Sequence, residues 1–252
     1  MKMHRFTYFL VVLVLATLGF SLARRAEPFV AAYVGSQGDP KADRFEDAKR
    51  NFPTADYNEG DSLDPQKNAE MKEKQKRHNN FKFVPVHPQP WQTESVFVAE
   101  GLFEFPALPV AQSDFILLGT VEAANAHLSE NKMNIFSEFT VVVGTAFKTA
   151  RKEITEGSVL TVERIGGFVK YPNGQKILFR ISGANMPKIG AQYLFFLNSK
   201  NKQDCSIITA YELTEKGALP LDESAQFEAL RGTAEADILK HLRDLLSKAS
   251  SN

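Results

Sequence analysis

Apolar and polar side chains alternate through most of the second half of the chain. Ile177, Phe179 and Ile181 are separated by polar residues such as Arg180, which is the period of two that a half-buried β-strand requires. The same period runs through a longer segment that starts near Met133. We expect about eight strands, at residues 96–99, 115–123, 133–147, 159–164, 168–171, 177–182, 193–197 and 206–213.

Turn signals between these segments predict how the strands are joined. The run Pro172-Asn173-Gly174 predicts a tight hairpin, because Asn and Gly tolerate positive φ. Gly144 lies inside a predicted strand, where an isolated glycine indicates a bend or a β-bulge. Short strands with hairpin turns and no helical period between them indicate a mainly β fold, which we expect to be a small antiparallel barrel over residues 91–221.

The last segment, residues 222–252, changes to a helical period. Its apolar positions fall at the i, i+1, i+4, i+7, i+8 spacing of one helix face, and they are Ile238, Leu239, Leu242, Leu245 and Leu246. A shorter helix is expected at 223–230. The leucine face either packs on the barrel, which we favour, or forms a contact for a partner or a membrane surface. Leu239, Leu242 and Leu246 are therefore candidate partner contacts.

The first 25 residues predict a membrane anchor or an export signal. Lys2 and Arg5 precede eighteen uncharged, mostly apolar residues, 6–23, and Arg24 follows. Eighteen residues lie within the ~17–25 that span a bilayer, whereas signal-peptide apolar cores run to about 7–15. The small residues Ser21 and Ala23 leave cleavage after Ala23 open. We expect the bulk of the chain to lie outside the cytoplasm.

Residues 26–90 predict a charged tether that ends in prolines. Between residues 39 and 77 there are 10 acidic and 9 basic side chains in 39 positions, so little apolar surface is available to offset the entropy of ordering. Residues 70–77 are compatible with a short solvated helix. We expect residues from about 91 onward to fold without the first 80.

Composition excludes several functional classes. The chain has 252 residues with 30 basic and 30 acidic side chains, so no overall positive field attracts nucleic acid. Cys205 is the only cysteine, which rules out an internal disulfide and a four-cysteine zinc site. No cofactor is expected.

Few residues suggest chemistry. His127 and Glu130 are three residues apart and Glu138 follows, a set that is compatible with a metal-dependent hydrolase but is also ordinary for a polar loop between strands. Glu163 and Arg164 are adjacent in a predicted strand and must face opposite sides. We expect a cross-strand salt bridge to Arg180 or Lys170 rather than a catalytic role. Neither set forms a known catalytic motif, so we expect a non-enzymatic protein.

Several strings resemble an uncharacterised family of exported or membrane-anchored bacterial proteins. These strings begin at Asp114, Leu128, Glu138, Val162, Tyr193 and Tyr211, and read DFILLGTV, LSENK, EFT, VERIGG, YLFFL and YEL. Their plan is similar to the OB-like barrel of the netrin and metalloproteinase-inhibitor type. The resemblance implies no catalytic residues, and the chain lacks the N-terminal cysteine with which that inhibitor type chelates a metal.

These observations predict a tethered β-barrel module of the bacterial cell envelope that binds or scaffolds a protein or glycan. Residues 6–23 would contact the membrane. The exposed faces of OB-like barrels bind ligands, and aromatic side chains such as Trp91 and Tyr171 are the expected contacts. The sequence alone leaves the ligand, the oligomeric state and cleavage of the N-terminal segment open.

Overall fold

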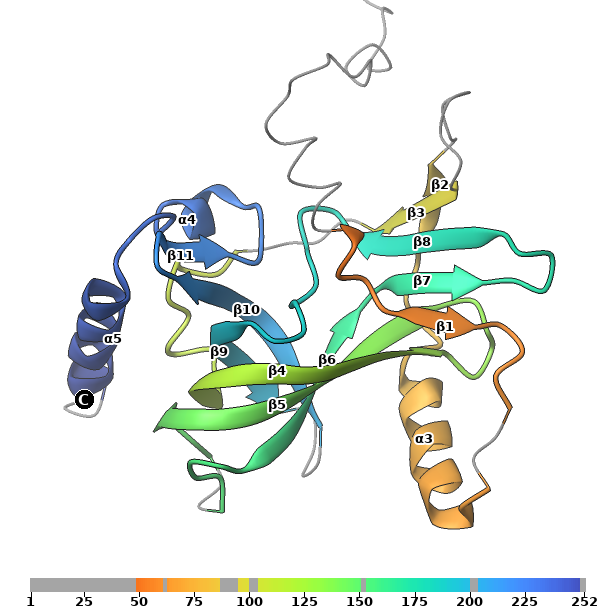
Figure 1. Ribbon diagram of the computed structural model, residues 1–252, viewed down its shortest axis with the longest axis horizontal. Coiled ribbons are helices and arrows are strands. Elements are labelled where there is room, and N and C mark those ends of the chain that lie inside the picture. Colours follow the sequence, from red (N-terminus) through yellow and green to blue (C-terminus); the bar gives the residue numbers. More distant parts are fainter. Residues whose placement is uncertain are drawn as a thin grey trace, which may run out of the picture. The chain divides into compact units, whose positions relative to one another are not determined.

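Strands dominate the computed structural model, which describes residues 49–60, 63–86, 95–99, 104–150, 153–199 and 204–249 (Figure 1). A mainly β fold was expected from the alternating pattern and is confirmed. The strands form two sheets, one of six strands and one of five. Among the described residues, no helix is both long and apolar enough to cross a membrane, and residues 6–23 lie outside the described part.

The six-stranded sheet holds the long strands. Its strands are β4 (Phe115–Leu128), β5 (Ile135–Lys148), β6 (Val159–Ile165), β9 (Gln192–Ser199), β10 (Cys205–Thr214) and β11 (Gly217–Pro220). Their order is β11-β10-β6-β5-β4-β9, and β10 also pairs with β9. Five strands thus form a closed circuit of pairings, in which only the β6–β10 joint is parallel.

The strands of the circuit supply most of the largest apolar cluster. Alternate residues of these strands are buried in this cluster, among them Phe115, Phe139, Val162 and Phe195, each 0% exposed. Alternation places every second side chain on one face of a strand, so the predicted period of two is confirmed by the burial pattern.

The five-stranded sheet has the order β1-β7-β8-β3-β2. Its strands are β1 (Thr54–Asp56), β2 (Val84–Val86), β3 (Ser95–Ala99), β7 (Gly167–Lys170) and β8 (Lys176–Ile181). The predicted hairpin at Pro172-Asn173-Gly174 joins β7 to β8, and Gly174 has a φ of 83°. Parallel pairing joins β1 to β7, with Thr54 opposite Phe168.

A bulge at Gly144 bends the longest strand pair. Leu118 is opposite Thr145 and Gly119 is opposite Val143, so Gly144 is left without a partner in the register. The bulge predicted at Gly144 is therefore confirmed. The neighbouring Gly119 allows a close approach, since a Cβ atom there would lie 2.5 Å from Cγ1 of Val141.

The C-terminal helix packs on the domain. After the short helix α4 (Ala225–Glu228), α5 (Glu235–Ala249) buries Ile238 and Leu242 against a second apolar cluster that includes Phe196 and Tyr211. Leu239, Leu245 and Leu246 are partly buried against the same cluster. This arrangement agrees with the packing interpretation of the leucine face.

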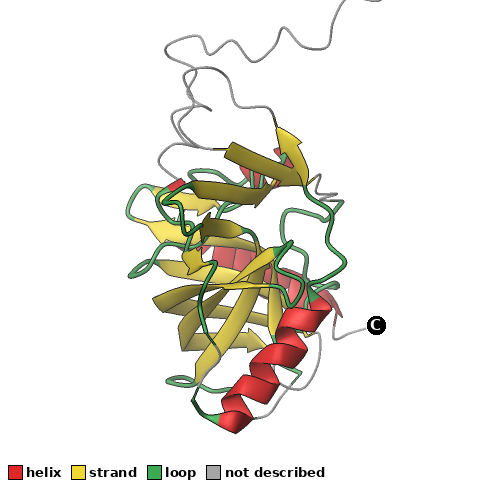
Figure 2. Cartoon of the chain, turned by 90° about the vertical axis from the view of Figure 1, so that its right-hand side faces the viewer, coloured by secondary structure: helices red, strands yellow, loops and turns green. Residues whose placement is uncertain are grey.

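The charged segment differs from the predicted flexible tether wherever the structure describes it. Helix α3 (Pro65–Arg77) follows β1, and Phe52 and Ala55 are buried at 5% and 1% exposure. The few apolar side chains of this segment are enough to order it, because they pack into cores that strands later in the chain form. Figure 2, which views the molecule from the side of α3, shows this helix in front of the strands.

Candidate functional site

The C-terminal turn of α3 carries cations to the larger sheet. The helix starts with Pro65 in its first turn, and the Asp64 carboxylate caps it by accepting hydrogen bonds from the backbone of Gln66 and Lys67 at 3.0 and 3.4 Å. Lys74 and Arg77 are three residues apart and so lie on one side of the helix.

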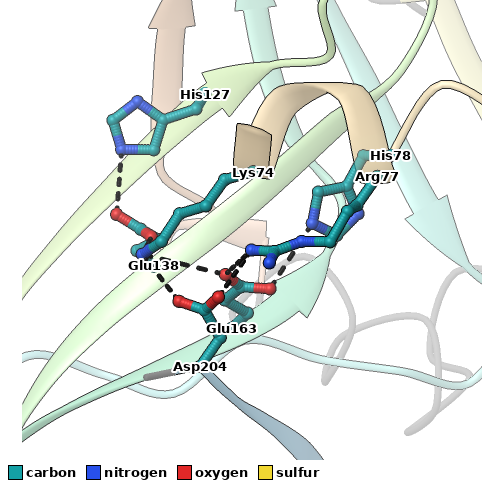
Figure 3. A network of polar contacts seen from close by, with 7 residues as sticks. All are labelled: Lys74, Arg77, His78, His127, Glu138, Glu163 and Asp204. Carbon is teal, nitrogen blue, oxygen red and sulfur yellow. Dashed lines mark hydrogen bonds and ion pairs between the residues drawn. The ribbon is translucent and has the colours of Figure 1, made fainter. Parts of the chain in front are cut away.

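Lys74 contacts three carboxylates from separate parts of the chain (Figure 3). Its Nζ lies 2.5 Å from Oε1 of Glu138 on β5 and 3.0 Å from Oδ1 of Asp204, next to β10. It also lies 3.9 Å from Oε1 of Glu163 on β6. One ammonium group therefore joins three strands of the circuit to α3.

Arg77 and His78 complete the contacts around Glu163. Nη2 of Arg77 lies 2.6 Å from Oδ2 of Asp204 and 3.8 Å from Oε1 of Glu163. Nε2 of His78 lies 3.4 Å from Oε2 of Glu163. Glu163 is only 1% exposed, so Lys74 and Arg77, rather than water, offset its charge.

Strand register explains why the cations are needed. Glu138 and Glu163 are directly opposite each other on β5 and β6, and like charges at such positions repel. Asp204 adds a third carboxylate, and Lys74 and Arg77 bring permanent positive charges next to these acids. We name the set Lys74, Arg77, His78, His127, Glu138, Glu163 and Asp204 the polar network.

The network shifts the pKa values of two of its members. Burial raises the pKa of the Glu138 carboxyl, but contacts with His127 and Lys74 outweigh burial and bring the pKa below its ordinary value of 4.5. Burial lowers the pKa of the Lys74 ammonium, but Glu138 and Asp204 outweigh it and bring the pKa above 10.5. Both groups are therefore charged at neutral pH.

The predicted set His127, Glu130 and Glu138 is only partly brought together. Strand β4 extends beyond its predicted end and carries His127, whose Nε2 lies 3.4 Å from Oε2 of Glu138. Glu130 instead accepts a hydrogen bond from Nδ2 of Asn79 at 3.0 Å. Among the described residues, no group of three or more His, Cys, Asp or Glu side chains has the arrangement of a metal site.

Glu163 and Arg164 face opposite sides of β6, as expected. Glu163 turns to α3, whereas Nη2 of Arg164 pairs with Oδ1 of Asp222. The ion pairs of Glu163 and Arg164 described above come from the C-terminal turn of α3 and from the segment after β11, and a cross-strand partner at Arg180 or Lys170 stays a prediction. Burial raises the pKa of Asp222, and Arg164 opposes this shift.

The residues that the sequence suggests as ligand or partner contacts differ in how deeply they are buried. Tyr171 is half-buried and stacks on Tyr57, with ring centroids 5.0 Å apart. Leu242 is fully buried under the sheet, and Leu239 and Leu246 are partly covered. Trp91 lies outside the described residues.

A cleft of about 730 Å³ opens beside the network, between α3 and the turn that joins β4 to β5. His127 and Gln75 line it, and its charged residues are of both signs. These are Lys67, Lys72, Lys132, Asp56, Glu59 and Glu130. This volume lies within the ~300–1,000 Å³ that small-molecule sites occupy.

Sequence signals exist for parts of this site. Asp64-Pro65 is a helix-start signal and Lys74 and Arg77 have helical spacing, while alternation places Glu138 and Glu163 on the outward faces of their strands. No sequence signal shows that the two glutamates are opposite each other. Comparisons with protein-family models, curated proteins and solved structures found no match.

Proposed function

We propose that the protein is a non-enzymatic binding module of the bacterial cell envelope, tethered to the membrane through residues 6–23, with its β domain outside the cytoplasm. The cleft between α3 and the β4–β5 turn carries this proposal, because it is the described feature with the size and polar lining of a ligand site. The apolar run 6–23, flanked by basic residues, supports the tether.

An OB-like barrel is the fold that we propose for the closed circuit. The OB-fold is a five-stranded Greek-key barrel, and it binds ligands on the face of its second and third strands and on the loops beside that face. The second and third strands of the circuit are β5 and β6. Glu138 and Glu163 of the polar network lie on these strands, and the cleft borders the β4–β5 turn. The OB-like fold and the position of the cleft therefore suggest the same face as the ligand site.

The lining of the cleft favours a neutral or zwitterionic polar ligand. Three lysines and three carboxylates balance each other, and Asn68, Gln75 and Ser129 add groups that both donate and accept hydrogen bonds. An envelope glycan has this chemistry, whereas a nucleic acid would require a basic surface. A protein partner of the envelope is the second candidate ligand, and Trp91 and Tyr171 are its proposed contacts.

Two measurements test this proposal. Full-length protein should fractionate with membranes and resist salt extraction, whereas a soluble chain that begins at Arg24 would mean that the N-terminal segment is a cleaved signal. The protein should also co-sediment with purified peptidoglycan sacculi. Lys132→Ala, in the cleft, should weaken this binding and Lys216→Ala, outside the residues that line the cleft, should not. Equal sedimentation of both variants would contradict the cleft as the glycan site.

A metal-dependent hydrolase is the alternative, favoured by one observation. His127 lines the cleft and contacts the Glu138 carboxylate at 3.4 Å, and a carboxylate that orients a histidine is common at metal and hydrolytic sites. Elemental analysis of the purified full-length protein distinguishes the two functions. One tightly held zinc ion per chain, lost in His127→Ala, would favour the hydrolase.

A further inference from the structure

A second recess lies where β6 and β10 separate, away from the cleft. Its volume is about 220 Å³. Four isoleucines and Ala184 form its apolar walls, and His78, Glu163, Arg164 and Ser206 supply its polar groups. The isoleucines are Ile165, Ile181, Ile207 and Ile208. We call this cavity the isoleucine recess.

Strand geometry explains why the recess exists. The parallel joint between β6 and β10 has only two residue pairs, Val162 with Cys205 and Glu163 with Ser206. Beyond it the register of β10 against β9 shifts between Ile207 and Thr209, leaving Ile208 as an extra residue. A bulge bends its strand away from its neighbour, so β10 leaves β6 at the level of the isoleucines.

Arg164 brings unused hydrogen-bond donors to this region. Its side chain is 5% exposed and its Nη2 pairs with Asp222. Nε and Nη1 of Arg164 are buried without a hydrogen-bond partner in the described part of the chain. A buried donor that lacks a partner is unfavourable, so these atoms indicate a group that the protein itself does not supply.

We propose that the isoleucine recess binds a small aliphatic carboxylate. Apolar walls suit a branched hydrocarbon body, and the free guanidinium N–H groups suit a carboxylate, which accepts charge-assisted hydrogen bonds from arginine. Glu163 does not repel the ligand strongly, because Lys74 and Arg77 lie within 4 Å of its carboxylate. Water in the recess would instead lie against the isoleucine side chains, which offer it no hydrogen bonds.

Binding of 4-methylpentanoate tests the proposal. We expect saturation-transfer NMR on full-length protein in lipid nanodiscs to show saturable binding with a Kd below about 1 mM, and at least tenfold weaker binding of the uncharged 4-methylpentanamide. Ala184→Leu fills the recess and should abolish the signal. Ile189→Leu changes an exposed side chain and should leave the signal unchanged. Any background from the lipid is the same for both variants.

Arg164→Lys separates the carboxylate contact from the apolar one. It keeps a positive charge next to Asp222 but removes the guanidinium donors, so binding of 4-methylpentanoate should weaken at least tenfold while the amide is unaffected. Equal binding of acid and amide to the native protein would overturn the carboxylate assignment and leave an apolar cavity only.

A measurement on the native chain covers the case in which the variants fail to fold. Hydrogen exchange with mass spectrometry should show slower exchange in peptides that contain residues 204–209 when 4-methylpentanoate is present. No change there at a saturating concentration, or no saturable binding at all, would overturn the proposal.

Discussion

The imidazole ring of His78 stacks on the phenyl ring of Phe136, with centroids 4.1 Å apart and planes inclined by 19°. Phe136 is fully buried at the start of β5. Asn134 adds a hydrogen bond from its Nδ2 to the carbonyl oxygen of His78 at 2.8 Å. These contacts attach the end of α3 to the same strand that carries Glu138. Apolar and ionic contacts therefore act together to hold the helix on the sheet.

Lys74→Met should destabilise the protein by about 2–4 kcal/mol. The substitution leaves Glu138 without its nearest cation and removes one of the two cations, Lys74 and Arg77, that pair with the buried Asp204. Removing one partner of a buried ion pair is costly. Lys76→Met, on the exposed side of the same helix, is the matched control and should change the free energy of unfolding by less than about 0.5 kcal/mol. Urea denaturation measures both, and equal effects would contradict the role of the network.

Acid should remove the stabilisation that Glu138 provides. Because the pKa of Glu138 is lower in the folded protein than its ordinary 4.5, its charged form stabilises the fold above that pH and the contribution is lost as pH falls through the folded value. Glu138→Gln should cost about 1.5–3 kcal/mol at pH 7 and progressively less as the pH falls below 4.5 and through the lowered pKa of the folded protein. Thermal melts across this range measure the difference, and a gap that stays constant with pH would refute it.

Two glycines of neighbouring strands should differ in their tolerance of a methyl group. An added Cβ at Gly119 would lie 2.5 Å from Cγ1 of Val141 and 3.0 Å from the carbonyl oxygen of Val142, whereas at Gly144 the nearest atom, the carbonyl oxygen of Leu118, is 3.5 Å away. Gly119→Ala should cost about 1–3 kcal/mol, and Gly144→Ala less than about 0.5 kcal/mol. Chemical denaturation of the pair decides the point.

Leu242→Ala should cost about 2–5 kcal/mol, because the side chain is fully buried between α5 and the sheet. Lys240→Ala changes an exposed position of the same helix and is the control. Thermal melts at low protein concentration give both values. An unchanged midpoint for Leu242→Ala would instead make the leucine face a partner surface.

A chain that begins at Phe81 should be far less stable than one that begins at Lys49. The shorter chain loses Phe52, Ala55 and His78, all buried, and deleting one buried phenyl ring alone costs about 3–5 kcal/mol. This reverses the expectation that residues from 91 onward fold by themselves. Near-ultraviolet circular dichroism and urea titration compare the two chains, and equal midpoints would restore the tether interpretation.

Local periodicity predicts most of the strands but misses β1, β2 and β11, and it does not predict charge pairing between distant segments. Gly144 was predicted at a bulge because an isolated glycine interrupts an alternating pattern, which is information contained in a short window. Lys74 is separated by 64 residues from Glu138 and by more from Asp204, and nothing in a charged, apolar-poor segment indicates which carboxylates it will meet. The same composition fits both a solvated tether and a helix whose cations pair with carboxylates from other parts of the chain.

The parallel pairing of β1 with β7 determines when the first part of the domain is able to fold during synthesis. Phe168 follows its partner Thr54 by 114 residues, the difference between the two residue numbers, and at about 5–20 residues per second the ribosome needs roughly 6–23 s to reach it. Until then β1 has been made without the strand that pairs with it. A charged segment stays soluble before its partner strand is made. The polar composition of this segment therefore suits a part of the domain that is made early and packs on the rest later.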